Sequence, residues 1–327
     1  MRALWYEKVG PAAEVLVTGE VPTPAPQAGE VLVRVSASGV NPVDVKLRNG
    51  LRPVPPGERV VPHFDGAGTI EAVGAGIGAD RIGERVWVYE AQWQRMSGTA
   101  AEYVSLPAHL AITLPDAADF AGAACLGIPA MTAHRCVFAD GPVSGQTVLV
   151  TGGGGAVSGY AIQFAKLGGA KVVATVSSPA KAEVAKVAGA DEMVNYTSDD
   201  VAARVMEMTA DAGVERIVEV ALGANFATTA GVLANNGVVA AYASDAEPEP
   251  ALPFRALLYK NAALRHVLVF GMPESAKAEA IADITRWLAD GSLRNAVGQR
   301  FPLDQAAKAH EAVEEGSLGN VVVEIGT

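Results

Sequence analysis

Four consecutive glycines at positions 152–155 give this chain its clearest chemical signal. They follow the apolar run 148–150, VLV, and precede a stretch with helical apolar spacing from about residue 157 to residue 167. A glycine-rich turn between a strand and a helix presents backbone N–H groups, and the helix N-terminus adds positive potential, so such a turn suits a pyrophosphate. The pattern therefore predicts a dinucleotide site at this turn.

The glycine fingerprint itself is imperfect. In one register GxGxxG falls on Gly153, Gly155 and Ser158, so serine stands where a third glycine would allow close helix packing, although Gly159 leaves the register open. A lone fingerprint is weak evidence, but here a strand precedes it, a helix follows it and a second strand ends near Val176. The cofactor contacts predicted at the turn are Gly153, Gly155, Ala156 and Val157.

The end of that second strand indicates which dinucleotide is bound. An NAD site usually has an acidic residue there, about 20 residues after the turn, to bind the ribose hydroxyls. This chain has Ser177 and Ser178 instead, with Lys181 close by. A carboxylate would repel a 2′-phosphate, whereas two hydroxyls and a lysine would accept it, so we predict NADPH. A turn with a helix N-cap, followed by a solvated lysine, would explain the same three residues without a cofactor.

The elements around the turn predict two domains. With 327 residues the chain exceeds the length that one core usually serves. Short strands between turns over residues 31–107 predict a β-rich domain, and an Ala-rich, helix-compatible stretch covers residues 117–138. From residue 147 strands and helices alternate, which is typical of a parallel sheet covered by helices.

The C-terminal half supplies further expected elements. We predict a helix over about 179–188, an edge strand at 264–271, a helix from an N-cap at Ser275 to Gly291, a helix over 304–315 and a strand at 320–325.

Composition excludes several classes of function. The net charge of −11 and a pI near 5 oppose unaided binding to nucleic acid or to an anionic membrane. No apolar run has the length of a membrane span and no signal peptide is evident at the start, so cytoplasmic residence is the expectation. Cys125 and Cys136 cannot form a four-thiolate zinc site, and we expect them to be reduced and buried.

Several spaced motifs resemble the medium-chain dehydrogenase/reductase superfamily, and within it the zinc-free NADPH quinone oxidoreductases related to zeta-crystallin. The resemblance covers nearly the whole chain. The motifs are SGVNPVDVKLRNG at 38–50, PHFDGAGTIEAVG at 62–74, GERVWVY at 83–89, GTAAEYVSLP at 98–107, LGIPAMTAH at 126–134, the glycine turn, and ATVSSPAKAEVAKVAGADEMVNY at 174–196.

The resemblance implies an α/β fold with a GroES-like β-barrel catalytic domain, residues 1–122 and 272–327, and a Rossmann doubly wound parallel-sheet domain, residues 123–271. It implies that Lys181 and Tyr196 hold the 2′-phosphate side of NADPH and that Asn41 and Thr132 lie near the nicotinamide. The chain lacks an arginine that some relatives carry near the 2′-phosphate at the C-terminal end. Further cofactor contacts expected on this basis are Ser244, Phe270 and Asn320.

Zinc alcohol dehydrogenases of the superfamily have a cysteine at the position of Asn41 and a histidine at that of Phe64, so neither ligand is present here. We therefore predict no metal site. His63 is adjacent, and we expect it to line the substrate cleft or to pack. The other histidines show no ligand spacing and are expected to be structural; they are His109, His134, His266 and His310.

Without the Lewis acid that stabilises an alkoxide, reduction of an electron-poor acceptor is the favoured chemistry. The predicted catalytic groups are Asn41 as a hydrogen-bond donor, Lys46 as a stabiliser of negative charge and Asp44 as an orienting group. Lys46 stands where quinone reductases often have tyrosine, and a solvated lysine and a capping aspartate are the structural alternatives. The candidate walls of the acceptor site are His63, Tyr89, Trp93 and Phe270, each of which packing would also explain.

Three functions remain in view from the sequence. The first is an NADPH:quinone reductase, and the second is an NADPH enone or acrylate-type reductase. The third, from a different class, is an NADPH-binding structural or RNA-binding crystallin-like protein, which the negative charge disfavours. Relatives commonly pair edge strands of their Rossmann domains, so a homodimer through residues 264–271 is expected.

Overall fold

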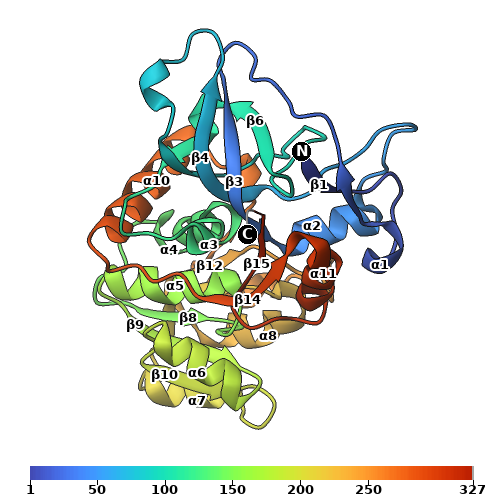
Figure 1. Ribbon diagram of the computed structural model, residues 1–327. Coiled ribbons are helices and arrows are strands. Elements are labelled where there is room, and N and C mark those ends of the chain that lie inside the picture. The colour runs from blue at the N-terminus through green and yellow to red at the C-terminus, as the bar shows by residue number, and fades with distance from the viewer. Residues whose placement is uncertain (326–327) are drawn as a thin grey trace. The chain divides into compact units, whose positions relative to one another are not determined.

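The computed structural model describes residues 1–325 and divides into two compact units (Figure 1). Unit 1 comprises Met1–Pro129 and the chain from Ile281 onward, and unit 2 comprises Ala130–Ala280. The second division falls inside helix α10, Glu274–Ala289. The domain limits predicted at 122 and 272 stay a prediction.

Unit 1 is built on a seven-stranded sheet in which six strands follow the order β14-β15-β3-β4-β5-β7 and β6 also pairs with β3. All pairs are antiparallel except β14 with β15. The strands are β3 Glu30–Val40, β4 Asp65–Val73, β5 Arg85–Val88, β6 Tyr103–Pro107, β7 Ala111–Thr113, β14 Val297–Pro302 and β15 Asn320–Glu324. A separate antiparallel pair joins β1 Arg2–Trp5 to β2 Val17–Glu20.

The helices of unit 1 are short. They are α1 Ala12–Val15, α2 Pro42–Lys46, α3 Phe120–Ala123 and α11 Ala306–Glu314. Helix α2 begins at Pro42, directly after the long strand β3, because a proline needs no N–H partner at the first helical position and Asn41 takes the extended N-cap conformation. This junction places Asn41 and Asp44 next to the start of β4, which pairs with the end of β3.

Unit 2 contains a six-stranded, fully parallel sheet in the order β10-β9-β8-β11-β12-β13, which confirms the predicted doubly wound arrangement. The strands are β8 Thr147–Val150, β9 Lys171–Val176, β10 Glu192–Asn195, β11 Val214–Glu219, β12 Leu233–Ala241 and β13 Ala263–His266. Their apolar residues are buried on both faces, as in β8 and β9, because helices cover the sheet.

Helix α4 precedes the first strand of unit 2, and the next helices alternate with the strands along the chain (Figure 1). They are α4 Met131–Phe138, α5 Ala156–Leu167, α6 Pro179–Val187, α7 Val201–Met208, α8 Leu222–Val232 and α9 Phe254–Tyr259. The chain order reverses between β8 and β11, since β9 and β10 lie on one side and β12 and β13 on the other. In doubly wound sheets ligands bind at the carboxyl ends of the strands at this switch point.

Two predicted elements differ from the structure. Strand 264–271 is at the sheet edge as expected, but β13 ends at His266 and residues Val269–Gly271 form a 3-10 turn, because the Gly271 N–H bonds back to the Leu268 carbonyl at 3.0 Å. Ser275 is not an N-cap. It lies within α10, because the Lys277 N–H bonds to the Pro273 carbonyl at 3.0 Å and the first turn therefore starts at the Pro-Glu pair.

Candidate functional site

The glycine turn of unit 2 has the backbone geometry of an anion site. Gly155 caps α5 without a side-chain hydrogen bond, so the N–H groups of the first helical turn have no capping side chain. The turn is held against β9, since the Gly153 N–H donates to the Thr175 carbonyl at 2.8 Å and the Gly152 N–H to the Thr175 hydroxyl at 3.1 Å. A Cβ on Gly153 would lie 2.9 Å from that of Ala174, so the close approach to β9 requires glycine there.

Ser158 fits the third fingerprint position. Its side chain is buried, and its hydroxyl donates to the Thr151 carbonyl at 2.9 Å and lies 3.3 Å from the Tyr242 hydroxyl. A small side chain with an internal partner satisfies the close packing that this position demands. Serine is therefore compatible with the fingerprint at this place in the fold.

Lys181 lies against the glycine turn. A Cβ on Gly154 would come within 2.7 Å of Lys181 Cγ and 2.8 Å of Lys181 Cβ, so the stem of the lysine packs on the turn backbone. Ser178 is the N-cap of α6, because its hydroxyl accepts the Lys181 N–H at 3.3 Å. Ser177 precedes it and is half-buried. The predicted capping role of Ser178 is thus present, and Lys181 is a cation beside the turn.

A cavity of about 490 Å³ lies at the carboxyl ends of the strands next to the turn. It has the size of a small-molecule site. Tyr196, predicted at the cofactor, is on its wall with 52% of its surface exposed. The other lining residues are Leu149, Thr151, Gly152, Thr175, Asp199, Val201, Val220, Ala221, Ala224, Asn225, Thr228 and Thr229.

Glu219 organises one wall of this cavity and was missed in the sequence. Its carboxylate is buried and accepts hydrogen bonds from the Thr151 hydroxyl at 2.9 Å, the Ala221 N–H at 2.7 Å, the Asn225 amide at 2.8 Å and the Thr229 hydroxyl at 3.0 Å. All four donors belong to residues that line the cavity. The usable signal in the sequence was a lone acid at the end of an apolar strand. A buried carboxylate needs several hydrogen-bond donors, so such an acid predicts a cluster of polar groups around it.

In unit 1 the amide of Asn41 bonds to a buried carboxylate. Asn41 Nδ2 donates to Asp65 Oδ2 at 2.9 Å, and the Ile128 N–H donates to the same oxygen at 2.8 Å. Both side chains are almost fully buried. Burial raises the pKa of Asp65 to about 7 against the opposing effect of these hydrogen bonds. Asp65 was missed in the sequence, although an acid beside Phe64 and Gly66 at the start of an apolar strand was a usable signal.

Asp44 joins the same cluster. Its Oδ2 accepts the Asn41 backbone N–H at 2.7 Å, as expected for an acid in the first turn of α2, and its carboxyl group also accepts the backbone N–H of His63. Burial raises the pKa of Asp44 well above its usual range, and the charge of Asp65 adds to this effect. The structure therefore brings Asn41, Asp44 and His63 together around two buried carboxyl groups.

His63 belongs to a buried chain of hydrogen bonds. The Thr99 hydroxyl donates to the Asp65 backbone carbonyl at 2.5 Å, so its oxygen must accept the Ser38 hydroxyl at 2.7 Å. The Ser38 oxygen in turn accepts the N–H at Nδ1 of His63, also at 2.7 Å. Nε2 of His63 then accepts from Nε2 of His310 at 3.0 Å, so the His63 ring is neutral in this arrangement. Burial lowers the pKa of His63 to about 3 and that of His310 well below its ordinary value. The His63 side chain is fully buried, and its place in the wall of the acceptor site stays a prediction.

Three further acceptor-side candidates belong to unit 1. Lys46 ends α2 and is half-buried, and Tyr89 is buried with its ring centroid 5.7 Å from that of Trp87. Trp93 is half-buried, and the Arg52 guanidinium lies 5.2 Å from its ring centroid.

The further cofactor candidates differ in setting. Thr132 is buried in α4, and Phe270 is half-buried in the 3-10 turn after β13. Ser244 accepts the Gly223 N–H at 2.9 Å, within unit 2. Asn320 belongs to unit 1, where its amide donates to the Ala296 carbonyl at 3.0 Å. The cofactor roles of these four residues stay predictions.

The positions of the zinc ligands in related dehydrogenases hold Asn41 and a buried Phe64. Within residues 1–325, no group of three or more His, Cys, Asp or Glu side chains is placed to hold a metal ion. Cys125 and Cys136 are buried free thiols, as expected, and burial raises the pKa of both, that of Cys136 to about 12. No helix among these residues has the length and apolar character needed to cross a bilayer.

The neutral histidine pair predicts a pH-dependent contribution to stability. Because folding lowers the pKa of His310, this histidine stabilises the fold above pH 6.5 and loses that contribution as the pH falls. The difference in unfolding free energy between wild type and His310→Leu should therefore shrink by about 2 kcal/mol from pH 7.5 to pH 5. Urea denaturation at both pH values measures it. A difference that stays constant between the two pH values would contradict the assignment.

Comparisons with known proteins agree with this architecture. The family described as "Alcohol dehydrogenase GroES-like domain" matches residues 27–116, and the family described as "Zinc-binding dehydrogenase" matches residues 156–286. The first match confirms the predicted GroES-like domain. The name of the second describes that family and not the ligand set of this chain, which lacks both zinc ligands named above.

Full-length relatives point to one branch of the superfamily. A quinone oxidoreductase of Pseudomonas aeruginosa is 31% identical over 316 residues, 95% of each chain, and that of Lama guanicoe is 29% identical over 326 residues, 99% of this chain and 97% of the relative. A solved NAD-dependent alcohol dehydrogenase superimposes with a TM-score of 0.91 at 32% identity over 100% of both chains. A mycobacterial protein solved with NADPH gives a TM-score of 0.88 at 30% identity over 99% of this chain and 100% of its own. The chain therefore belongs to the medium-chain dehydrogenase/reductase superfamily, among the relatives of the quinone oxidoreductases.

Proposed function

We propose that this chain is an NADPH-dependent reductase that transfers a hydride to quinones without a metal ion. The observation that carries the proposal is Lys181, which packs on the glycine turn at a site where the preceding strand ends without a carboxylate. The quinone oxidoreductase relatives and the mycobacterial structure with NADPH support it.

The residues of unit 2 fit this cofactor. The uncapped first turn of α5 and the glycines before it offer N–H donors for the pyrophosphate, and the adjoining cavity is large enough for a part of a dinucleotide. Lys181 and Ser177 would bind the 2′-phosphate, with Tyr196 beside them. When bound, NADPH supplies the hydride. The remaining cofactor contacts proposed from the sequence are Thr132, Ser244, Phe270 and Asn320.

The residues of unit 1 would hold the acceptor side. Asn41 is fixed by its bond to Asp65, so its amide is a preorganised group for a substrate oxygen or the cofactor ribose. Lys46 would stabilise negative charge that develops on the acceptor, and Asp44 orients Asn41 through the N–H bond. Tyr89 and Trp93 offer aromatic surface for a flat acceptor. Solvent supplies the proton that completes the reduction.

Lys181→Ala tests the cofactor assignment. If the ammonium group binds the 2′-phosphate, the Kd for NADPH should rise by about 10- to 100-fold, the range of one charge-assisted hydrogen bond, while the Kd for NADH changes by less than about twofold. Calorimetric titration with both dinucleotides measures this. Lys186→Ala, at the other end of α6, is the matched control and should leave both values unchanged. Equal weakening of NADPH and NADH would contradict the role of Lys181.

A comparison of acceptors tests the reaction. We expect NADPH oxidation with simple benzoquinones and naphthoquinones, a higher kcat/KM for quinones than for enones or acrylate esters, and no loss of rate in a metal chelator. A higher kcat/KM for enones would support the double-bond reductase instead. A secondary alcohol oxidised with NAD would support a dehydrogenase, the activity that the name of one similar structure describes. Strong inhibition by a chelator, reversed by zinc, would contradict the metal-free proposal.

We also propose a homodimer through β13. This strand is the edge of the parallel sheet, and large apolar side chains near it in the sequence are exposed, namely Leu252, Phe254, Leu258, Tyr259 and Leu268. Sedimentation at micromolar concentration should give the mass of two chains.

An RNA-binding role, the alternative from another class, would require RNA affinity that falls with salt, and the net charge of −11 opposes it.

A further inference from the structure

A second cavity of about 240 Å³ lies in unit 1, and its lining includes residues that follow α2 and precede β4 in the chain. Leu47 follows α2 directly, and Phe64 precedes Asp65, so the cavity adjoins the proposed acceptor groups. Its volume corresponds to about eight liquid waters, which suits a single ring or a short side chain. Apolar walls are formed by Leu47, Pro53, Val54, Val60, Phe64 and Met96.

The polar groups of this cavity include cations and amides but no carboxylate. Arg52, Arg95, Gln92, Gln94 and the hydroxyl-bearing Tyr6 complete its lining. The chain has 36 acidic and 25 basic residues and is negative overall. A cavity lined by two arginines and no acid is therefore locally positive, unlike the chain as a whole.

Arg52 is held in place without a carboxylate partner. Its guanidinium lies 5.2 Å from the centroid of the Trp93 ring, and within residues 1–325 it forms no ion pair. Stacking on an aromatic ring orients a guanidinium and leaves its N–H edge for a planar anion. Arg52 is exposed, so it is a solvent-accessible cation at this cavity whose guanidinium lies over Trp93.

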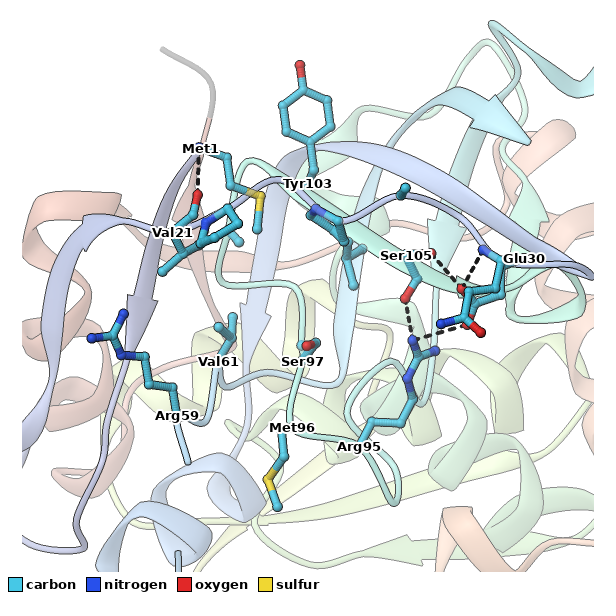
Figure 2. A pocket seen from close by; sticks show the side chains of 17 residues that line it. Met1, Val21, Glu30, Arg59, Val61, Arg95, Met96, Ser97, Tyr103 and Ser105 are labelled. Atoms are coloured by element: carbon cyan, nitrogen blue, oxygen red, sulfur yellow. Dashed lines mark hydrogen bonds and ion pairs between the residues drawn. The ribbon is translucent and has the colours of Figure 1, made fainter. Parts of the chain in front are cut away.

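Two further polar atoms in the lining have no partner among the described residues. They are Nη1 of Arg95 and Oε1 of Gln92, and the Gln92 side chain is 94% buried, with 6% of its surface exposed. Figure 2 shows Arg95 from a neighbouring pocket, where its Nη2 donates to the Ser105 carbonyl at 2.5 Å and to Glu30 at 3.4 Å. Glu30 offsets part of the Arg95 charge, so Arg52 is the main cation. Because both atoms are buried from solvent, a ligand in the open cavity does not reach them, and the guanidinium groups remain its polar contacts.

We propose that this cavity binds a carboxylate on the electron acceptor, so that the enzyme prefers quinones or activated alkenes that carry a carboxylate beside the reducible group. This inference rests on the proposed reductase function. The guanidinium groups of Arg52 and Arg95 donate hydrogen bonds to the carboxylate, and the apolar walls pack against the ring or chain that carries it. Arg52 is thereby a specificity-determining residue.

A matched pair of acceptors tests the preference. The first is benzoquinone with a propionate side chain, and the second is its methyl ester, in which the methylene linker leaves the quinone nearly unchanged. With NADPH at low salt, wild type should show a kcat/KM at least about tenfold higher for the carboxylate, and Arg52→Gln should reduce that ratio to near one. Arg52→Lys should retain part of the ratio. Arg34→Gln, an exposed arginine of β3 paired with Glu71, removes the same charge elsewhere and should keep the full ratio.

A binding measurement separates this inference from the reductase proposal. The probe is 3-(2,5-dimethoxyphenyl)propanoate, which has the same shape and charge but no reducible group, titrated calorimetrically in the absence of NADPH. We expect wild type and Arg34→Gln to bind it and Arg52→Gln to bind it about tenfold more weakly.

Equal binding by wild type and Arg52→Gln, or equal turnover of acid and ester, would overturn the inference. Binding that depends on Arg52 without turnover of any quinone would support the anion site while contradicting the reductase function. If acetate or inorganic phosphate displaced the probe at the same concentration as the probe's own Kd, the site would bind anions in general, and the acceptor assignment would be overturned.

Discussion

The approach of a polypeptide backbone to a phosphate group sets the main constraint on this protein. A phosphate can reach the N–H groups of the α5 first turn only if no side chain intervenes, and the turn must also pack on β9 and α6. Gly153 meets the second requirement, because a Cβ there would collide with Ala174. Thr175 fixes the turn through two hydrogen bonds, and Lys181 packs on Gly154. The parallel sheet holds these parts in register, so the cofactor site depends on the packing of the whole unit.

Unit 1 solves a different problem, which is how to keep polar groups inside a β-rich core. Asp44 and Asp65 are buried, and their hydrogen bonds to Asn41, Ile128 and His63 fix the junction between β3 and α2. The chain from Thr99 through Ser38 to the histidine pair leaves one tautomer for each ring. Such a network specifies a unique arrangement because each donor already has an acceptor. Asn41 is consequently a rigid group rather than a mobile surface amide.

Periodicity and turn residues were sufficient to predict the parallel sheet, the glycine turn and the edge position of β13. They were not sufficient for β13 beyond His266 or for the start of α10, where local backbone hydrogen bonds decide between strand, turn and cap. Asp65, Glu219 and His310 were missed as members of the polar clusters for a common reason. The partners of each come from distant parts of the chain, so the sequence near it contains no spacing that reveals them.

The central claim is that a chain with Asn41 and Phe64 at the zinc-ligand positions reduces quinones with NADPH. Single-turnover mixing tests it most directly. Protein shown by elemental analysis to contain no stoichiometric metal is loaded with one equivalent of NADPH and mixed with excess benzoquinone, and absorbance at 340 nm is followed. The account predicts that the NADPH is consumed in one exponential phase, much faster than without protein. Unchanged absorbance, or oxidation that appears only after zinc is added, would contradict it.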